Sequence, residues 1–249
     1  MHQRIEIMGC KIDNLTMEET LQAIDFFIKS QKPHQHVVVN VDKIVKANKD
    51  PNLRRIINEC ALINVDGVPI MWAAALLGKP LKERVTGIDL FFAIMERAAT
   101  KQWRIFLLGA TEDVVTTVKQ FYERTYPNII IAGYRNGYWQ PEEEPSIVQQ
   151  IKAAKADLLF VAISSPKKEQ FLNQYQAFMN IPFAMGVGGT FDIVAGKLKR
   201  APRWMQDIGF EWFYRFLQEP KRMFRRYFIE DMAFFSILFK ELKSYKQRH

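Results

Sequence analysis

Short runs of apolar residues recur along the chain from residue 5 to residue 187, and most are bounded by Gly, Asp or Asn. Several runs are continuous instead of alternating with polar residues, which is typical of strands covered on both faces of a parallel sheet. The runs predict seven strands, at residues 5–8, 36–40, 61–65, 104–108, 129–132, 158–163 and 183–187.

The segments between these runs have the features of helices. Thr16 and Glu19 have the spacing of a capping box, which predicts a helix that extends to about residue 30. Pro166 stands where the first turn of a helix over residues 167–178 tolerates proline. Strands that alternate with helices predict an α/β fold, a Rossmann-like open and largely parallel sheet with helices on both faces. Functional residues in such folds lie at the carboxyl ends of the strands.

The C-terminal part of the chain has a different pattern. It predicts two helical segments, at about 203–217 and 220–245, within an appendage of residues 197–249 on a catalytic body of residues 1–196. In the second segment eight apolar side chains recur at spacings of three and four and form one stripe: Phe224, Tyr227, Phe228, Phe235, Leu238, Phe239, Leu242 and Tyr245.

A stripe flanked by arginines and lysines has two open interpretations. It is typical of a helix that lies on an anionic membrane surface, which we assign to residues 220–245. It is equally typical of a helix packed on its own domain or on another subunit, so a homo-oligomer is possible. Nucleic acid is not favoured as a partner, because the basic residues stand among Phe and Met.

Composition and charge sharpen the division between body and appendage. The 249 residues include 35 Lys and Arg against 27 Asp and Glu, a net charge of +8. Residues 197–249 contain 13 Lys and Arg and 6 Asp and Glu, so they carry +7 of that charge and the body carries +1. An apolar content of 48% and a charged content of 25% exclude a disordered or collagen-like chain.

The cellular compartment is predicted from what the sequence lacks. Cys10 and Cys60 are too few for a disulfide framework or a cysteine-based zinc site, and predict buried thiols in a reducing compartment. The N-terminal residues contain no apolar signal segment, and no run of about 18 apolar residues could cross a bilayer. These features predict a cytoplasmic protein.

Polar residues collect directly after the predicted strands. Asp66 follows one strand and precedes a glycine, which makes it a candidate general base that lines a cleft or, alternatively, a cap for the next helix. Asn40 ends the preceding strand. The loop before the next helix contains Arg84, which could pair with a phosphate or with Asp66, and Thr86 and Asp89, which could bind substrate or cap that helix.

Two glycine-bearing loops join strands to helices, one at Gly109 and one at Gly188 and Gly189 with Asp192 close behind. Backbone N–H groups in such loops could face a phosphate, although neither loop has the complete dinucleotide-binding or P-loop motif. Tyr138, in an aromatic loop, could stack on a base or a sugar, or simply pack in a turn. These features favour a nucleotide ligand over a dinucleotide.

The arginines of the appendage have a possible chemical role. A nucleotide diphosphate that leaves carries charge which must be stabilised as the bond breaks, and guanidinium groups do this without a metal. Arg215, Arg222 and Arg225 would suit this role if the appendage folds over the cleft. The sequence contains no HExxH, no Asp-x-Asp and no Gly-x-Ser-x-Gly motif, so neither a metal site nor a cofactor is predicted.

Taken together, these segments resemble the WecG/TagA/CpsF family of bacterial glycosyltransferases. The similar stretches run in order through nearly the whole chain, at residues 64–67, 83–89, 106–109, 133–138, 165–167, 187–192, 195–196, 200–204, 209–212 and 215–220. The resemblance implies an inverting transfer of a sugar from a UDP-sugar to a polyprenyl-diphosphate-linked saccharide for teichoic acid or another surface polysaccharide. It also implies a Rossmann-like fold on the inner face of the plasma membrane, with an appendage that docks on the membrane and completes the site.

The resemblance assigns roles to particular residues. Asp66 matches the proposed catalytic base, Asn40 matches the Asn of the second strand, and the appendage arginines match Arg215, Arg222 and Arg225. Three pocket positions depart from the family pattern: Val38 stands for Thr, Ser164 for Gly and Lys168 for Gln. Because Lys168 could pair with a carboxylate or phosphate, the donor could be N-acetylmannosamine, its uronic acid or a hexose. A non-catalytic nucleotide-sugar-binding membrane adaptor on the same fold is the competing hypothesis.

Overall fold

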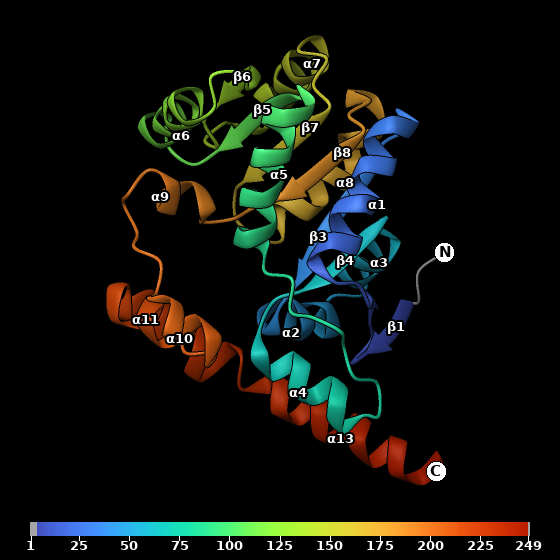
Figure 1. Ribbon diagram of the computed structural model, residues 1–249. Helices are drawn as coiled ribbons and strands as arrows, with labels where there is room; N and C mark the ends of the chain where they lie inside the picture. Colours follow the sequence, from blue (N-terminus) through green and yellow to red (C-terminus); the bar gives the residue numbers. More distant parts are fainter. Residues whose placement is uncertain (1–3, 249) are drawn as a thin grey trace.

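The computed structural model describes residues 4–248 and is built on one six-stranded parallel sheet (Figure 1). The strand order is β4-β3-β8-β7-β5-β6, and every adjacent pair is parallel. The predicted α/β class is therefore confirmed, and the strands lie within a few residues of their predicted bounds: β3 (His34–Val39), β4 (Leu62–Val65), β5 (Arg104–Gly109), β6 (Ile130–Arg135), β7 (Leu158–Ala162) and β8 (Phe183–Gly186).

The first predicted strand does not join this sheet. β1 (Arg4–Ile7) instead pairs antiparallel with β2 (Cys10–Asp13), a strand that the sequence pattern did not predict. Met8 and Gly9 between them both have positive φ, so the chain reverses within two residues. The hairpin is held beside β4, because the Ile63 N–H donates to Oδ2 of Asp13 at 2.8 Å.

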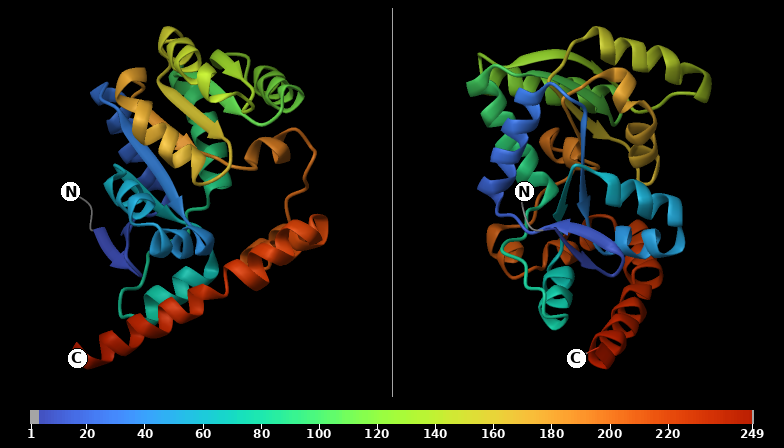
Figure 2. Two further views of the ribbon diagram at one scale, coloured as in Figure 1. Left: turned by 180° about the vertical axis from the view of Figure 1, so that it is seen from behind. Right: turned by 90° about the vertical axis from the view of Figure 1, so that its right-hand side faces the viewer.

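Helices cover both faces of the sheet, as predicted (Figure 2). One face packs against α1 (Met17–Ser30), α5 (Gly87–Lys101), α6 (Glu112–Thr125) and α9 (Thr190–Val194). The other face packs against α2 (Val41–Lys49), α3 (Pro51–Glu59), α7 (Glu144–Ala153), which follows the short 3-10 turn η1 (Pro141–Glu143), and α8 (Lys167–Met179). Continuous apolar runs are required because both faces are buried.

The predicted capping box is present at the start of α1. The Glu19 N–H donates to Oγ1 of Thr16 at 3.2 Å, and the Thr16 N–H donates to Oε2 of Glu19 at 2.8 Å. Side-chain caps of this kind stabilise a helix by about 1 kcal/mol. Cys10 and Cys60 are buried free thiols, and burial raises the pKa of both.

The appendage contains more elements than the two predicted helices. The first segment divides at Gly209, which has a φ of +79°, into α10 (Arg203–Asp207) and α11 (Glu211–Gln218). The second divides into α12 (Pro220–Arg225), the π-helical turn η2 (Arg226–Glu230) and α13 (Ala233–Arg248). A single continuous helix over 220–245 was therefore wrong, because a π turn and a bend interrupt it.

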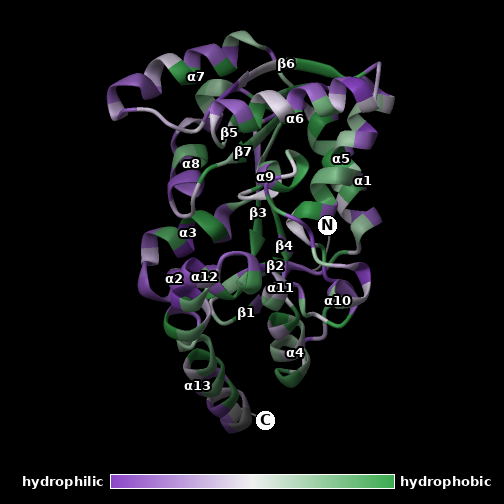
Figure 3. Ribbon diagram, turned by 90° about the vertical axis from the view of Figure 1, so that its left-hand side faces the viewer, coloured by the Kyte–Doolittle hydropathy of each residue, from purple (hydrophilic) through white to green (hydrophobic). Residues whose placement is uncertain are grey.

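The predicted stripe divides with the helix. Leu238, Leu242 and Tyr245 of α13 pack on the core beneath α4 (Val68–Leu76), around the fully buried Phe234. The exposed members of the stripe are Phe224, Phe228, Phe235 and Phe239. Packing on the body and exposure of apolar side chains both occur. Helix α4, which is mainly hydrophobic, and α13, which alternates hydrophobic and hydrophilic residues, lie at one end of the molecule (Figure 3). None of the described helices is long and apolar enough to cross a membrane.

Candidate functional site

Asp66 lies where the sheet predicts function. It directly follows β4, and its N–H donates to the Val39 carbonyl of the neighbouring strand β3 at 2.9 Å. Because Val39 and Val65 are partners in the parallel register, Asn40 and Asp66 come next at two adjacent strand ends. The helix-cap interpretation of Asp66 is wrong, since α4 begins at Val68, its N-cap residue is Gly67 with no side-chain cap, and the turn uses the φ of +121° at that glycine.

The surroundings of Asp66 favour a proton acceptor. Burial raises the pKa of its carboxyl above the ordinary value, the nearby acids Glu211 and Asp89 raise it further, and Arg84 opposes them. The Asp66 side chain nevertheless stays 38% exposed, and its Oδ1 lies 3.8 Å from Nη1 of Arg84. A carboxylate with a raised pKa that solvent can still reach is suited to general base catalysis.

Arg84 is held at both ends of its guanidinium group. One nitrogen faces Asp66, and Nη2 donates to the Gln206 carbonyl of the appendage at 3.2 Å. The predicted pairing of Arg84 with Asp66 is thus present. Asn40 caps α2, because its Oδ1 accepts from the Lys43 N–H at 3.0 Å.

The glycine loop after β8 meets an arginine of the appendage. A Cβ atom at Gly189 would lie 2.7 Å from Nη2 of Arg215 and 3.8 Å from Oδ2 of Asp192. The Arg215 Nε is buried and donates no hydrogen bond to any of the described residues. Gly188, Gly189, Asp192 and Arg215 are therefore brought together, with Nη2 of Arg215 at the loop and its Nε 3.9 Å from Oε2 of Glu219.

The other two predicted arginines do not reach this loop. Nη2 of Arg222 lies 2.6 Å from Oε2 of Glu219, and Nε of Arg225 lies 3.1 Å from Oε1 of Glu230. The Arg225 side chain is 78% exposed. Their guanidinium groups would have to leave these partners to contact a diphosphate at the Gly189 loop.

Thr86 and Asp89 both make structural contacts at the start of α5, although the Asp89 side chain stays 40% exposed. Thr86 is buried and caps α5, and its hydroxyl donates to Oδ2 of Asp89 at 2.5 Å. Arg200 donates two hydrogen bonds, of 2.6 and 2.8 Å, to the Asp89 carboxylate, and its Nε lies 3.4 Å from Oε1 of Glu211. Burial would raise the pKa of Asp89, but the Arg200 and Thr86 hydrogen bonds outweigh it and lower the pKa.

Gly109, at the end of β5, lies close to the loop that contains Tyr138. With a φ of +129°, Gly109 packs so close to β7 that a Cβ would lie 2.5 Å from the Ala162 carbonyl carbon. Its role is close packing, which only glycine permits here. Next to it, a concavity of about 310 Å³ is lined by Gly137, Tyr138, Trp139, Gln140, Glu143 and Lys167.

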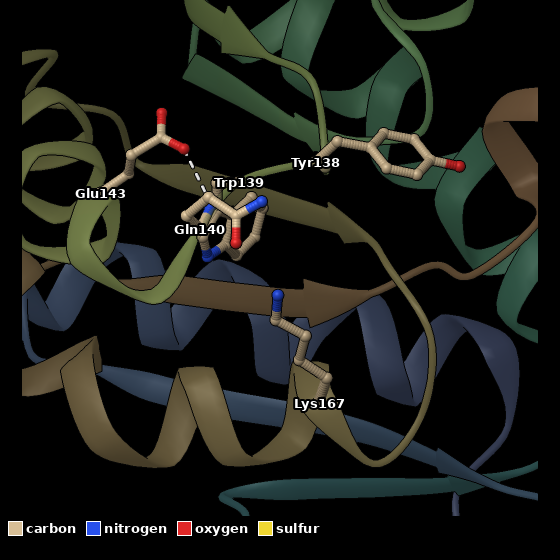
Figure 4. Close-up of a pocket in the computed structure, with 6 residues that line it drawn as sticks. Tyr138, Trp139, Gln140, Glu143 and Lys167 are labelled. Atoms are coloured by element: carbon tan, nitrogen blue, oxygen red, sulfur yellow. Dashed lines mark hydrogen bonds between the residues drawn. The ribbon is translucent and has the colours of Figure 1, made fainter.

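The concavity has polar and aromatic walls (Figure 4). The Lys167 ammonium lies 4.3 Å from the centre of the Trp139 ring, and the Gln140 N–H donates to Oε2 of Glu143 at 2.8 Å. The exposed Tyr138 ring points away from the Trp139 and Lys167 pair (Figure 4). The ring of Tyr138 is exposed and not packed in a turn, and its stacking on a base or a sugar stays a prediction.

Lys168 is buried in a cluster that the sequence did not reveal. Oε1 of Glu169 lies 3.2 Å from Nζ of Lys43 and 3.6 Å from Nζ of Lys168. Burial, together with the Lys43 charge, lowers the pKa of Lys168 to about 8. The Lys168 stem packs under Gly186 at the end of β8. Lys43 comes from α2, more than a hundred residues away in the sequence, so no local pattern could have linked it to Lys168.

Arg200 was also not identified as a functional residue, although it stands in one of the stretches that resemble the family. Its partner Asp89 is equally distant in the sequence, so only the fold shows the pairing. Across residues 4–248, no three His, Cys, Asp or Glu side chains come together as the ligands of a metal ion would.

Comparison with known proteins identifies the family of the chain. The sequence model described as "Glycosyl transferase WecG/TagA/CpsF family" matches residues 5–248. A Bacillus subtilis protein is 35% identical over 195 residues, which are 78% of this chain and 75% of that protein. A Staphylococcus aureus protein is 32% identical over 224 residues, 89% of this chain and 87% of that protein. Both carry the name N-acetylglucosaminyldiphosphoundecaprenol N-acetyl-beta-D-mannosaminyltransferase.

Proposed function

Because the chain belongs to the WecG/TagA/CpsF family of glycosyltransferases, we propose that it transfers N-acetylmannosamine from a UDP-sugar to N-acetylglucosaminyl-diphosphoundecaprenol. The acceptor and the sugar are those in the names of the relatives. The observation that carries the proposal is Asp66, a reachable carboxyl group with a raised pKa at the carboxyl edge of the sheet. The product would be an intermediate of wall teichoic acid or a related surface polysaccharide.

The positions at which the pocket departs from the family pattern bear on the identity of the donor sugar. A uronic acid donor would require a free cation, and Lys168 already shares the Glu169 carboxylate with Lys43. Two ammonium groups on one carboxylate leave a net positive charge, but the Lys168 side chain is only 10% exposed, so a uronate carboxylate has little access to it. N-acetylmannosamine is favoured over its uronic acid for this reason, and over a hexose by the names of the relatives.

The reaction is proposed to proceed by a single displacement. Asp66 takes the proton from the acceptor hydroxyl, whose oxygen forms a bond to the anomeric carbon as the bond from that carbon to the UDP oxygen breaks. The electron pair of the broken bond goes to UDP, and the configuration at the anomeric carbon inverts. Arg84 holds Asp66 in position, and the backbone at Gly188 and Gly189 with Arg215 stabilises the charge on the diphosphate. Arg222 and Arg225 would add to this stabilisation once they turn from their acidic partners.

Membrane attachment is the second part of the proposal. The acceptor named for the relatives is lipid-linked. The appendage has a net charge of +7 and exposes four apolar side chains, Phe224, Phe228, Phe235 and Phe239. A basic, aromatic surface is suited to the headgroup region of an anionic bilayer. We propose that the appendage docks peripherally on the inner face of the plasma membrane.

The decisive experiment incubates the purified chain with radiolabelled UDP-N-acetylmannosamine, UDP-N-acetylmannosaminuronic acid or UDP-glucose and a lipid-linked N-acetylglucosamine acceptor. Labelled lipid product from the first donor is the expected result. Tight UDP-sugar binding without product would favour the membrane adaptor instead. Transfer is expected to continue in EDTA, and a loss of activity that Mn²⁺ restores would contradict a metal-independent reaction.

A further inference from the structure

Helix α4 presents a bare apolar face beside the candidate base. All nine of its residues, Val68–Leu76, are apolar, and the helix begins directly behind Asp66 and Gly67. On its outer side Trp72 is 66% exposed and Leu76 is 62% exposed. Residues four apart lie on one face of a helix, so these two side chains form a single patch.

The inner side of α4 is fixed to the protein. Ile70, Ala73 and Ala74 are buried in the same core as Phe234 of α13. A helix with no polar face is found either buried or in contact with lipid, and α4 is buried on one side only. Since a helix rises about 1.5 Å per residue, nine residues are too short to cross a bilayer.

The appendage contacts α4 near both of its ends. Near its start, Val68 lies so close to Gly209 that a Cβ there would be 2.6 Å from Cγ2 of Val68. Just after its end, Gly78 packs against the Tyr245 ring of α13 in the same way. The helix therefore belongs to the surface that the appendage forms, and not to a separate part of the molecule.

Helix α4 and the appendage lie at the same end of the molecule (Figures 1 and 3), and both expose large apolar side chains. Large apolar side chains are exposed on the appendage at Trp204, Ile208, Trp212, Leu217, Phe224, Phe228, Ile229, Met232, Phe235 and Phe239. Exposed cations that form no ion pair within the described part of the chain accompany them: Arg203, Lys221, Lys240 and Lys243.

We propose that α4 is a second membrane-contacting element, located on the body, whose Trp72 and Leu76 enter the headgroup region of an anionic bilayer together with the appendage. The inference rests on the proposed function, because a lipid-linked acceptor must reach Asp66 from the membrane. The cations of the appendage complement anionic lipid, and tryptophan is favoured at the bilayer interface. Contact through α4 holds Asp66 directly above the bilayer surface, where the diphosphate of the acceptor lies.

The first test uses the full-length protein with the double substitution Trp72→Ser and Leu76→Ser. Sedimentation with vesicles of phosphatidylglycerol and phosphatidylcholine is expected to show about tenfold weaker binding, since two large apolar side chains lose their burial. The matched control is Phe26→Ser, because Phe26 is 67% exposed and its helix α1 lies away from the appendage (Figure 1). Equal binding of the native protein and the double variant would overturn the proposal.

A second measurement does not depend on the stability of that double variant. Cys10 and Cys60 are buried with raised pKa values, so a thiol reagent will label Leu76→Cys or Phe26→Cys selectively. An environment-sensitive dye at position 76 should shift to the blue on vesicle addition, and the same dye at position 26 should not. A blue shift in vesicle-free solution that grows with protein concentration would instead indicate a second copy on this face and would overturn the membrane assignment.

The failure of this inference can be told apart from failure of the proposed function. With a water-soluble, short-chain acceptor, the Trp72→Ser and Leu76→Ser variant is expected to retain native turnover. With the long-chain acceptor embedded in vesicles its turnover should fall in proportion to the lost binding. If the native protein fails to transfer sugar to either acceptor, the proposed function is wrong, whatever the vesicle measurements show about α4.

Discussion

Asp66 is the side chain on which the proposed reaction depends most directly. Replacing it by Asn keeps its size and removes its ability to accept a proton, so turnover should fall by about 100- to 10,000-fold. Steady-state kinetics with the lipid-linked acceptor would measure the loss. The matched control is Asp207→Asn, an exposed carboxylate on α10. Turnover near the native value in Asp66→Asn would show that another group is the base.

The raised pKa of Asp66 also predicts how activity and stability depend on pH. The base must be deprotonated, so the rate should fall as the pH is lowered through a pKa above the usual range for aspartate. The folded protein holds this proton more tightly than the unfolded chain, so the carboxylate destabilises the fold as the pH rises through that value. Asp66→Asn should therefore melt at a higher temperature than the native protein at neutral pH. A lower melting temperature would contradict the raised pKa.

The contact between Gly189 and Arg215 can be tested by a pair of substitutions. Gly189 has an ordinary φ of −77°, so Ala causes no backbone strain there, but its Cβ displaces the Arg215 guanidinium group. Arg215→Ala should lower kcat/KM by about 100-fold, and Gly189→Ala should lower it less. The double variant should be no worse than Arg215→Ala alone, because both changes remove one interaction. Additive losses would show that the two residues act separately. Lys32→Ala, an exposed cation on the body, controls for the lost charge.

The start of the appendage is fastened to α5 by one ionic contact. Arg200→Ala removes both hydrogen bonds to Asp89 and the contact with Glu211, at a cost of about 1 kcal/mol for a partly exposed pair. Limited proteolysis should then cut the connection between α9 and α10 faster than in the native protein. Lys199→Ala is the control, since the Lys199 side chain is exposed and only its backbone N–H and carbonyl are hydrogen-bonded, both to the Gln218 side chain.

The pH dependence of this contact has a defined sign. The folded state lowers the pKa of Asp89. The contact therefore makes its full contribution to the stability of the fold above the usual aspartate pKa, and that contribution is lost as the pH falls through the lowered value. The difference between native and Arg200→Ala melting temperatures should therefore shrink in acid. A constant difference, or equal rates of cleavage, would show that the contact does not fasten the appendage.

Elements set by local pattern were predictable, and those set by distant contacts were not. Continuous apolar runs predicted the six parallel strands to within a few residues, because burial on both faces requires such runs. β2 is only four residues long and alternates with a lysine, so its pattern was too short to recognise. The interruption at η2 left no sign in the spacing of the apolar residues, which continues across it. The pairing of Arg200 with Asp89 spans 111 residues and depends on the fold alone.

The uneven distribution of charge along the chain predicts which lipids the whole molecule binds preferentially. Residues 197–249 carry +7 and the body carries +1, so the appendage should supply nearly all preference for anionic lipid. Each cation near such a surface contributes about 1 kcal/mol, and salt weakens the attraction. Full-length protein should bind phosphatidylglycerol vesicles far better than phosphatidylcholine vesicles, with a difference that shrinks in high salt.

Deleting residues 197–249 should remove that preference and abolish transfer, since Arg215 leaves the Gly189 loop. The deletion also uncovers Ile70, Ala73 and Ala74, which α13 covers around Phe234, so the truncated chain should melt lower and aggregate. Any residual binding to lipid would then come from apolar surface and would not distinguish anionic from neutral vesicles. A truncated chain that still prefers phosphatidylglycerol, with the same salt dependence as the full-length protein, would place the anionic contact on the body and contradict the docking role of the appendage.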